Sequence, residues 1–392
     1  MKLTRGTMRA GPLILAIAGA NAIYSTHATT PASPKVLFLR APNNGIQPQS
    51  VIDSEGVLHV IYFLGDVSAG DIEYVKREPS GNLSKPIRVN SNPRSAVAIG
   101  TVRGPQMSVG RNGRVYVVWF GSQKEAGDPN TTMPVFFTRL DDSRRSFEPQ
   151  RNLMQYTQGA DGGLSIAADL QGHIYAVWHA TGAEPGEDRR RVYLAYSSDD
   201  GKTFGRELPV SPAELGACGC CGMRALADTH GRLYILYRAA AQRIHRDMTL
   251  LVSSDQARTF RITSLSPWEL NACPMSTAYL SAGKMRMLAS WEKANRVYFD
   301  CVDAESLTPS FAVQAPDDGA DQKHPAVAVN AKNQILLAWT EGTGWSKGGS
   351  LAWQLFDSAG KPLGPTGHVP GVPAWDLPSI FADRDGNFTI AY

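Results

Sequence analysis

The chain has 392 residues, of which 43% are hydrophobic and 19% are charged, with 37 glycines and 25 prolines in no collagen-like period. This composition is typical of a turn-rich globular protein and excludes a disordered chain. The 39 lysines and arginines nearly balance the 36 aspartates and glutamates, and Lys2, Arg5 and Arg9 lie in the first ten residues. Because the rest of the chain is close to neutral, we expect no nucleic acid and no anionic membrane surface as partners.

The N-terminal residues have the pattern of an export signal. A basic segment at residues 1–9 precedes a short apolar run at residues 13–18 and small-residue cleavage sites near residues 20–22 and 26–28. The run is too short to span a bilayer. We therefore expect a signal peptide and cleavage region at residues 1–28, a flexible lead at residues 29–34, and a single periplasmic or secreted domain at residues 35–392 without membrane insertion.

A two-strand pattern recurs seven times in the remaining chain. Each copy has a short apolar strand, a turn with glycine or asparagine, and an alternating strand that often ends in tryptophan or tyrosine. The copies are separated by 51 to 59 residues and start at Pro48, Pro105, Leu164, Met223, Pro274, Pro325 and Pro378. Alternation with period two, bounded by turns such as Asn-Gly and Asp-Gly, predicts a β-hairpin in each copy.

Further strands follow most of these hairpins. Third apolar strands are expected at residues 72–75, 135–138, 192–196, 249–252, 297–301 and 350–355, each followed by a weaker fourth strand. A repeating unit of four antiparallel strands is typical of a β-propeller blade, because one such sheet cannot cover both of its faces until neighbours stack around an axis. We therefore predict an all-β fold, a β-propeller of four-stranded antiparallel blades.

The two ends of the chain are expected to complete one blade together. Residues 37–45 resemble residues 311–319, so the N-terminal strand at residues 35–40 reads as the fourth strand of a blade. The C-terminal hairpin at residues 378–392 supplies the first two strands, and the third is missing. This arrangement gives seven blades, one of them incomplete and closed by the N-terminal strand, and avoids an open sheet edge. A six-bladed ring with the terminal pieces packed outside is the alternative.

Two segments match the turn motif S-x-D-x-G-x-T-[FW]. The first has Ser197, Asp199, Gly201, Thr203 and Phe204, and the second has Ser253, Asp255, Thr259 and Phe260, with Ala257 in place of glycine. Residues 142–147 form a degraded third copy. In such a turn the carboxylate accepts backbone N–H bonds, glycine allows a positive φ, and the aromatic ring fills the space between strands. We expect these residues to stabilise turns between third and fourth strands.

This motif is the Asp-box, or BNR repeat, and the chain resembles the sialidase superfamily of β-propellers over nearly all of its mature length. The resemblance implies an exported propeller that binds glycans or acts as an exo-sialidase-type glycoside hydrolase. A retaining sialidase holds the sugar carboxylate with three arginines that converge on the axis. It attacks with a tyrosine activated by a glutamate, and an aspartate serves as the acid.

Four residues are the candidates for such a catalytic site. Arg224 lies on the innermost strand of the fourth repeat, Arg238 follows its second strand, and Arg246 and Asp247 open its third strand. The alternative for the arginines is a pairing with a neighbouring blade at the rim, which contributes about 1 kcal/mol or less.

Other positions depart from the family's pattern. Its first arginine stands in an Arg-Ile-Pro sequence, and the nearest match, Arg40, falls on the outer strand of the closing blade. Gln47 or Gln49 takes the corresponding inner position. Tyr279 is the tyrosine nearest to an inner-strand position, and we expect it to be part of the core.

A group of cysteines precedes two successive inner strands. Cys218, Cys220 and Cys221 come just before the inner strand of repeat four, Cys273 opens repeat five, and His324 opens repeat six. Because blades are related by rotation, equivalent positions meet near one mouth of the channel. Cys220, Cys221, Cys273 and His324 could bind copper or zinc, with Met223 and Met275 nearby.

A disulfide between Cys273 and one of Cys218, Cys220 and Cys221 is the alternative, because cysteines of an exported protein usually pair. Cys301 is expected to be a small buried hydrophobic residue.

Two functions of different kinds follow from these patterns. The first is a glycan-binding or exo-sialidase-type propeller, with its ligand at the channel. The alternative is a non-enzymatic periplasmic propeller that binds a metal ion or a partner protein at a channel mouth lined by cysteine and histidine. Three arginines around one carboxylate position favour the first, and clustered sulfur and imidazole without such a triad favour the second.

Overall fold

The computed structural model describes residues 34–79, 81–122, 133–182, 186, 189–283, 286–317 and 319–392. The expected signal peptide and most of the expected lead lie outside these residues. The described residues form 27 β-strands and short 3-10 helices, η1 (Pro42–Asn44), η2 (Arg111–Gly113) and η4 (Ala213–Leu215). Within these ranges, no helix is long and apolar enough to cross a membrane.

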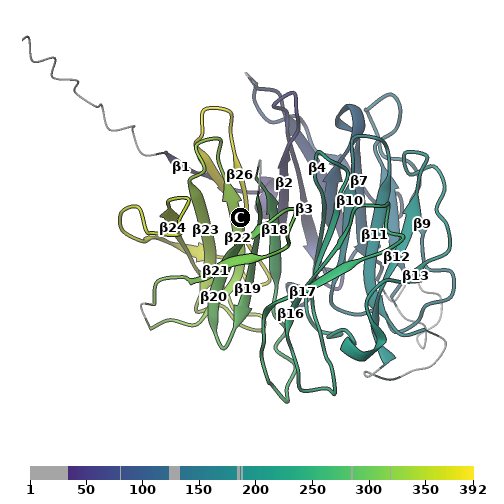
Figure 1. The fold of residues 1–392 in the computed structure, drawn as a ribbon. Coiled ribbons are helices and arrows are strands. Elements are labelled where there is room, and N and C mark those ends of the chain that lie inside the picture. Colours follow the sequence, from purple (N-terminus) through teal and green to yellow (C-terminus); the bar gives the residue numbers. More distant parts are fainter. Residues whose placement is uncertain are drawn as a thin grey trace, which may run out of the picture. The chain divides into compact units, whose positions relative to one another are not determined.

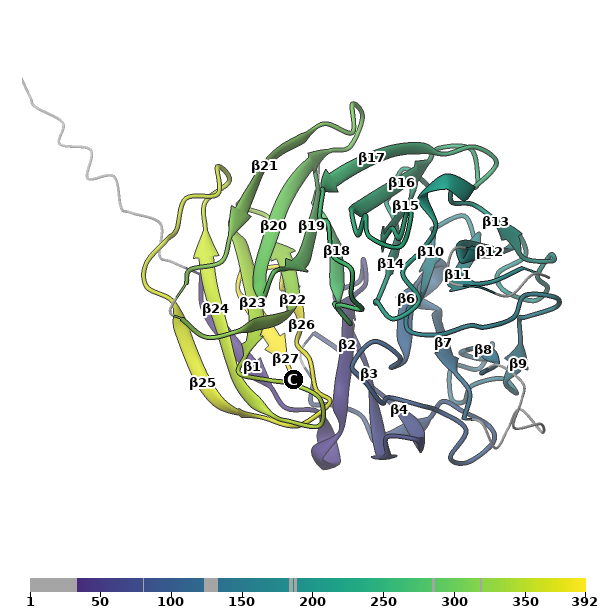
Figure 2. The ribbon, with the colours of Figure 1, turned by 90° about the horizontal axis from the view of Figure 1, so that it is seen from below.

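The described strands form seven sheets arranged around an axis, so the seven-bladed prediction is confirmed and the six-bladed alternative is wrong (Figures 1 and 2). Six sheets have four antiparallel strands in chain order from the inside to the outside. Blade 1 has β2 (Ile46–Ile52), β3 (Leu58–Asp66), β4 (Ala69–Arg77) and β5 (Ile87–Arg88). Blade 2 has β6 (Gln106–Val109), β7 (Val115–Phe120), β8 (Val135–Arg139) and β9 (Arg151–Asn152).

The next blades repeat this order. Blade 3 has β10 (Leu164–Ala168), β11 (Ile174–Ala180), β12 (Arg191–Ser197) and β13 (Leu208–Pro209). Blade 4 has β14 (Arg224–Ala227), β15 (Leu233–Arg238), β16 (Met248–Ser253) and β17 (Arg261–Ser266). Blade 5 has β18 (Ala278–Ala282), β19 (Arg286–Lys293), β20 (Arg296–Asp303) and β21 (Pro309–Gln314). Blade 6 has β22 (Gln322–Val329), β23 (Ile335–Glu341), β24 (Gly349–Phe356) and β25 (Gly367–Val372).

Blade 7 is built from both ends of the domain, as the sequence predicted, and it has three strands. The sheet has the order β26 (Ser379–Ala382), β27 (Phe388–Ala391), β1 (Val36–Leu39). β1 pairs directly with β27, and the pairing is parallel. In an antiparallel blade a fourth strand runs parallel to the second, so the direction of β1 agrees with the predicted fourth strand, and the prediction of an incomplete blade closed by the N-terminal strand is confirmed. With no third strand in the C-terminal segment, the edge of β27 is free, and β1 bonds to it directly.

The hydrophobic core lies between the blades. In one cluster, Trp178 of blade 3 packs with Tyr116 and Phe137 of blade 2, and all three side chains are fully buried. Similar clusters join the other neighbouring blades, and Trp119, Trp291 and Trp339 are also fully buried on second strands. Both faces of a blade are thus covered only by its neighbours, as expected for stacked repeats.

Side chains join the inner strands across blade boundaries. Ser108 Oγ accepts a hydrogen bond of 3.0 Å from the backbone N–H of Ala168, and Ser165 Oγ accepts one of 2.9 Å from Ala225. At the closing seam, the hydroxyls of Ser50 and Ser379 lie 2.8 Å apart. These bonds link the inner strands of neighbouring blades, which belong to separate sheets and do not pair with one another through backbone hydrogen bonds.

An Asp-x-x-Gly turn recurs in the inner hairpins, and the sequence analysis did not identify it. In blade 3, Asp169 Oδ1 accepts bonds of 2.9 Å from the backbone N–H groups of Gln171 and His173, and Gly172 has a φ of 94°. Asp53, Asp228 and Asn330 form the same pair of bonds two and four residues ahead. The spacing of Asp or Asn three residues before Gly or Asn was the available signal.

The two segments at residues 197–204 and 253–260 form the expected turns. Asp199 accepts bonds from the backbone N–H and the hydroxyl of Thr203, at 2.9 and 2.6 Å, and from the Ser197 hydroxyl at 2.7 Å. Asp255 makes the equivalent bonds to Thr259 and Ser253. Phe204 packs edge-on against Phe137 of the preceding blade, with ring centroids 4.8 Å apart.

In the degraded third copy, the carboxylate comes from Asp141 and not from Asp142. Asp141 accepts bonds from the hydroxyls of Ser143 and Ser146, at 2.8 and 2.6 Å. Asp142 instead contacts Arg114 at 2.6 Å. One extra residue in this turn shifts the acceptor by one position, so the motif spacing pointed to the wrong aspartate.

A buried carboxyl lies at the closing seam. Asp376 is 1% exposed, and its Oδ1 accepts bonds from the backbone N–H groups of Gln47, at 2.6 Å, and Leu377, at 2.8 Å. Its Oδ2 has no hydrogen-bond partner among the described residues. Burial raises the pKa of Asp376 to about 7, although these two N–H bonds and the charge of Arg40 oppose the rise.

We expect a chain that begins at residue 41 to be much less stable than one that begins at residue 34. The shorter chain lacks β1, which leaves the edge of β27 open and removes the stacking of Arg40 on Tyr392, 3.8 Å from the ring centroid. We predict a melting temperature lower by about 5 °C or more. Equal melting temperatures for the two truncated chains would show that β1 does not close the ring.

We expect Asp199→Ala to lower the free energy of unfolding by about 1–2 kcal/mol at pH 7. Burial opposes ionisation, but the bonds from Thr203 and Ser197 outweigh it and lower the pKa of Asp199 to about 2. The stabilisation is therefore present above the unfolded pKa of about 4 and is lost as the pH falls towards 2. Urea unfolding at pH 7 and pH 2.5 tests this, with the exposed Asp385→Ala as control, and an effect that does not change with pH contradicts it.

We expect Asp376→Asn to change how stability depends on pH. A carboxyl with a raised folded pKa stabilises the fold most below its unfolded pKa, and the contribution is lost as the pH rises from about 4 to 7. Relative to Asp376→Asn, the wild type should lose roughly 3 kcal/mol over this range. Parallel stability curves for the two proteins, measured by urea unfolding from pH 4 to pH 8, would show that Asp376 is ionised in the fold.

Candidate functional site

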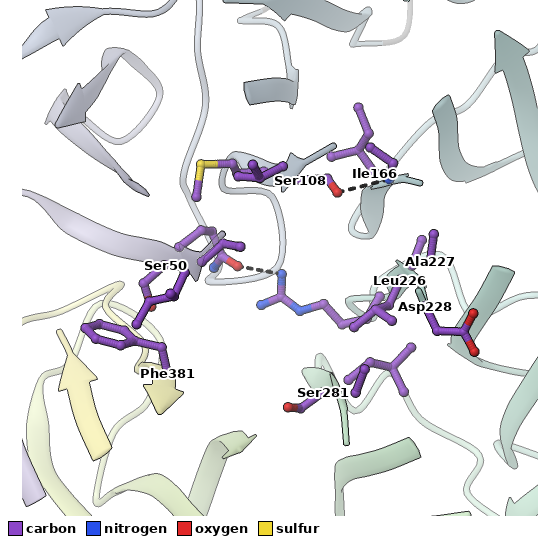
Figure 3. Close-up of a pocket in the computed structure, with 18 of the residues that line it drawn as sticks. Ser50, Ser108, Ile166, Leu226, Ala227, Asp228, Ser281 and Phe381 are labelled. Atoms are coloured by element: carbon purple, nitrogen blue, oxygen red, sulfur yellow. Dashed lines mark hydrogen bonds between the residues drawn. The ribbon is translucent and has the colours of Figure 1, made fainter. Parts of the chain in front are cut away.

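The inner strands enclose an axial cavity of about 520 Å³. Its wall comes from all seven blades of the ring and includes Ser50 of β2, Ser108 of β6, Ile166 of β10 and Ser281 of β18 (Figure 3). Most of the lining residues belong to the second halves of the inner strands and the turns that follow them. The cavity therefore lies towards the face of the ring where the inner strands end.

Among the described residues that line this cavity, Arg224 is the only arginine. Its Nε donates to the carbonyl of Ala278 at 3.1 Å, and its Nη1 donates to Oε1 of Gln49 at 2.9 Å. The guanidinium carbon lies 4.9 Å from the centroid of the Tyr279 ring. Burial lowers the pKa of Arg224 to about 10, so the group remains charged at neutral pH. Both bonds go to neutral oxygens, and the charge has no carboxylate partner among the described residues.

The carboxylates at the rim of the cavity are held by their own turns. Asp169 accepts two backbone N–H bonds and a bond of 2.6 Å from the His173 ring. Asp228 is bonded in the same way within its turn and forms an ion pair of 2.7 Å with Arg232. Asp53 accepts two backbone bonds and contacts His59 at 3.2 Å. Arg224 is therefore the charged group of the lining that is free to meet a ligand.

The other predicted catalytic residues do not lie at this cavity. Arg238 is 2% exposed, and its guanidinium donates to the carbonyls of Arg246 and Glu292 and to the Ser276 hydroxyl. Arg246 is also buried, and Asp247 accepts a bond of 2.9 Å from the backbone N–H of Trp268. Arg238 ends β15, and Arg246 and Asp247 lie in the loop between β15 and β16 of blade 4, so the described residues do not bring an arginine triad together on the axis.

A tyrosine and glutamate pair is also not assembled in the cavity. Tyr279 lines it, but its hydroxyl lies 3.1 Å from the Ser379 hydroxyl, and the described lining contains no glutamate. Arg40 stacks on Tyr392 and donates to the carbonyl of Gly371. Gln47 bonds to the carbonyls of Ala98 and Trp375. The sequence departs from the family's pattern at these positions, and the described cavity lining likewise lacks the tyrosine–glutamate pair.

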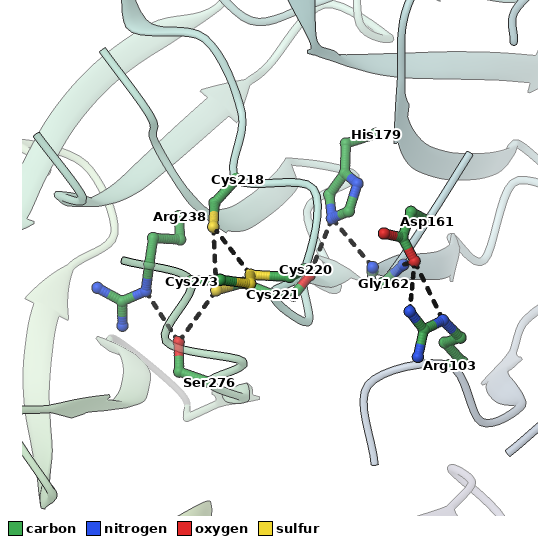
Figure 4. The surroundings of a disulfide bond; sticks show 11 residues. Arg103, Asp161, Gly162, His179, Cys218, Cys220, Cys221, Arg238, Cys273 and Ser276 are labelled. Atoms are coloured by element: carbon green, nitrogen blue, oxygen red, sulfur yellow. Dashed lines mark hydrogen bonds and ion pairs between the residues drawn. A yellow bond between two sulfur atoms is a disulfide. The ribbon is translucent and has the colours of Figure 1, made fainter. Parts of the chain in front are cut away.

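The cysteines gather in the loops that precede β14 and β18. Cys220 forms a disulfide with Cys273 and joins blades 4 and 5 (Figure 4). Cys218 and Cys221 are free thiols, and the sulfur atoms of Cys218, Cys220 and Cys221 all lie within 4.8 Å of one another. None of these cysteines is among the residues that line the axial cavity. The cluster belongs to the opposite face, where the inner strands begin. Cys301 is a free buried thiol in β20, as expected.

His324 does not join the sulfur cluster. Its ring contacts the hydroxyls of Thr340, at 2.8 Å, and Thr101, at 3.1 Å, and its backbone N–H donates to Glu292. Burial lowers the pKa of His324 to about 4. The predicted ligand set of Cys220, Cys221, Cys273 and His324 is therefore not assembled, because two of its cysteines are paired and its histidine lies one blade further on. The rotational argument placed these residues on one face but did not give their distance from the axis.

No family model and no curated protein matches this sequence. Among solved structures, the chain is similar to the Hadza microbial sialidase Hz136, with 11% identity and a TM-score of 0.51, over 83% of this chain and 74% of that one. It is also similar to the α-L-arabinanase of Penicillium chrysogenum complexed with arabinobiose, with 10% identity and a TM-score of 0.52, over 83% of this chain and 98% of that one. This likeness concerns the fold, which is that of a sialidase-like β-propeller.

Proposed function

We propose that this sialidase-like β-propeller is an exported glycan-binding protein that holds the carboxylate of an acidic sugar on Arg224 in the axial cavity. The observation that carries the proposal is the half-buried guanidinium of Arg224, which has no carboxylate partner among the described residues. Removing a charge partly from water costs free energy unless the charge is paired, and a ligand anion can supply the partner.

The geometry of Arg224 suits a carboxylate. Two of its nitrogens already bond to Ala278 and Gln49, whereas its Nη2 has no hydrogen-bond partner among the described residues. A carboxylate can take Nη2 and replace the amide oxygen of Gln49 at Nη1, which gives a bidentate pair. Such a pair is stronger in a partly enclosed cavity than in bulk water, because the effective dielectric constant is lower near protein.

The rest of the cavity suits the neutral part of a sugar. The hydroxyls of Ser50, Ser108 and Ser281 line the wall, and the rim carboxylates of Asp169 and Asp228 have lone pairs left to accept bonds from sugar hydroxyls. Because these carboxylates would repel a second anion at the rim, the site favours a ligand with one negative charge placed deep and hydroxyls placed outside.

We propose binding and not hydrolysis for this site. Exo-sialidase chemistry in this fold needs three arginines and a tyrosine next to a glutamate, and the described lining has one arginine, Tyr279 and no glutamate. The Tyr279 hydroxyl lies within hydrogen-bond distance of the Ser379 hydroxyl, and the Tyr279 ring packs against the Arg224 guanidinium. This arrangement positions the arginine and offers no general base to the tyrosine.

We expect Arg224→Gln to weaken the binding of acidic sugars at least about 10-fold, since one charge-assisted pair is worth about 1.5–3 kcal/mol. Isothermal titration calorimetry with N-acetylneuraminic acid, glucuronic acid and neutral glucose measures this. The matched control is Arg88→Gln, an exposed arginine on β5 of blade 1. The wild type and the control should bind at least one of the acids and not glucose.

Two results would overturn the proposal. Binding of an acid that Arg224→Gln leaves unchanged would place the site elsewhere on the molecule. Release of product from a fluorogenic sialoside by the wild type, lost in Arg224→Gln, would show a glycosidase in place of a binding protein.

A further inference from the structure

The cysteine cluster combines a disulfide with two free thiols at contact distance. Cys218 Sγ lies 3.5 Å from Cys220 Sγ, which is bonded to Cys273, and 3.3 Å from Cys221 Sγ (Figure 4). Thiol–disulfide exchange begins when a thiolate attacks a disulfide sulfur, so the attacking sulfur must reach it directly. Cys218 already lies in contact with such a sulfur.

Buried positive charge surrounds the free thiols. Nε of Arg238 donates to the Ser276 hydroxyl at 2.9 Å, and that hydroxyl donates to Cys221 Sγ at 3.4 Å. The other bonds of Arg238 go to backbone carbonyls, and no described carboxylate pairs with it. A buried cation without a carboxylate partner favours an anion nearby, and the thiol of Cys221 is the acid that the hydrogen-bond chain reaches.

A second buried arginine adds to this field. Arg246 is 7% exposed, and its Nε and Nη1 have no hydrogen-bond partner among the described residues. Burial alone would raise the pKa of Cys221, but the bond from Cys218, the charge of Arg238 and the bond from Ser276 lower it to about 6. The bond to Cys221, together with burial, raises the pKa of Cys218. Of the two thiols, Cys221 is therefore the one that the Ser276 hydrogen bond and the charge of Arg238 favour as a thiolate.

The disulfide faces the solvent, whereas the thiols do not. Cys273 is exposed and Cys220 is half-buried, and Cys218 and Cys221 are each 1% exposed. A substrate can therefore reach Cys273 but not the thiols behind it. The four sulfur atoms thus form an outer pair, Cys220 and Cys273, and a buried inner pair, Cys218 and Cys221.

We propose that the four cysteines form a thiol–disulfide exchange centre, in which the inner pair Cys218 and Cys221 exchanges with the outer pair Cys220 and Cys273. Cys273 is the contact point for a thiol-bearing substrate. This inference does not depend on the sugar-binding proposal, because the cluster does not line the axial cavity.

The exchange proceeds in two balanced steps. In the first, Cys218 passes its proton to the Cys221 thiolate and attacks Cys220 Sγ. A bond forms between Cys218 and Cys220, the bond to Cys273 breaks, and Cys273 leaves with the electron pair and takes a proton from water. In the second, Cys221 attacks Cys218 Sγ and passes its proton to the departing Cys220 sulfur. One disulfide remains throughout, so no external oxidant is required, and the outer cysteines become a dithiol.

Maleimide labelling of the full mature chain without a reductant, followed by peptide mapping by mass spectrometry, tests the proposal. In the wild type we expect Cys273 to be labelled at least 10-fold faster than in Cys218→Ser, where the first step cannot occur. In Cys221→Ser, Cys273 should be labelled while a Cys218–Cys220 disulfide accumulates, because the second step is blocked. Cys301→Ser is the matched control, a buried cysteine outside the cluster, and should label like the wild type.

Cys301 also reports on folding in the other variants, because it stays unlabelled while blade 5 is intact. If Cys273 is labelled no faster in the wild type than in Cys218→Ser, the disulfide is a static link between blades and the proposal fails. If native mass spectrometry finds bound copper or zinc and labelling starts only after chelation, the sulfurs hold a metal and the proposal also fails.

A second arm replaces maleimide with reduced glutathione or with a peptide that carries two cysteines. Formation of a mixed disulfide on Cys273 supports the proposal, and the faster probe shows whether a small thiol or a protein dithiol is the partner. No adduct with either probe would overturn it.

Discussion

Each blade of this protein has two apolar faces, and only neighbouring blades cover them, so the fold depends on closing the ring. The parallel pairing of β1 with β27 provides this closure, because it completes a sheet that the C-terminal hairpin cannot finish alone. Asp376 and Ser379 hold the same seam from the inside, through Gln47 and Ser50. An open ring would expose one face of blade 7 and one of blade 1 and would lose the hydrophobic cluster between them.

Closure also determines where functional groups can lie. The inner strands of neighbouring blades are joined by serine side chains and not by a backbone ladder, which leaves a cavity between them. Arg224 reaches this cavity from β14, while Arg238, at the end of the next strand, is buried among loops at the opposite face. Both arginines lack carboxylate partners among the described residues. In our account, a ligand carboxylate balances the first charge and the Cys221 thiolate balances the second.

The architecture could be predicted from the sequence because each blade repeats the same local pattern. Alternating strands and turns with positive φ, as at Gly172, fix the hairpins without reference to distant contacts. The direct partner of β1 could not be predicted in this way, because similarity to residues 311–319 identifies a strand but not the strand with which it pairs. Pairing of β1 with β27 depends on an edge that only the folded ring presents.

The candidate site was harder to predict for a related reason. Alignment of the repeats indicates the blade and the face of the ring to which a residue belongs. It gave the correct blade and face for Arg224 and for the cysteines. It does not indicate depth or side-chain direction, so Arg238 and His324 were assigned to sites that they do not reach. The Asp-x-x-Gly turns could have been found, since their spacing is regular, whereas the free charge of Arg224 is visible only once its neighbours are known.

A crystal structure of the protein soaked with the acidic sugar that binds most tightly would test the central claim most directly. The account predicts sugar density in the axial cavity, with the carboxylate within hydrogen-bond distance of the Arg224 guanidinium and the hydroxyls towards Asp169 and Asp228. Density at the face where the inner strands begin, with Arg224 still bonded only to Ala278 and Gln49, would contradict it.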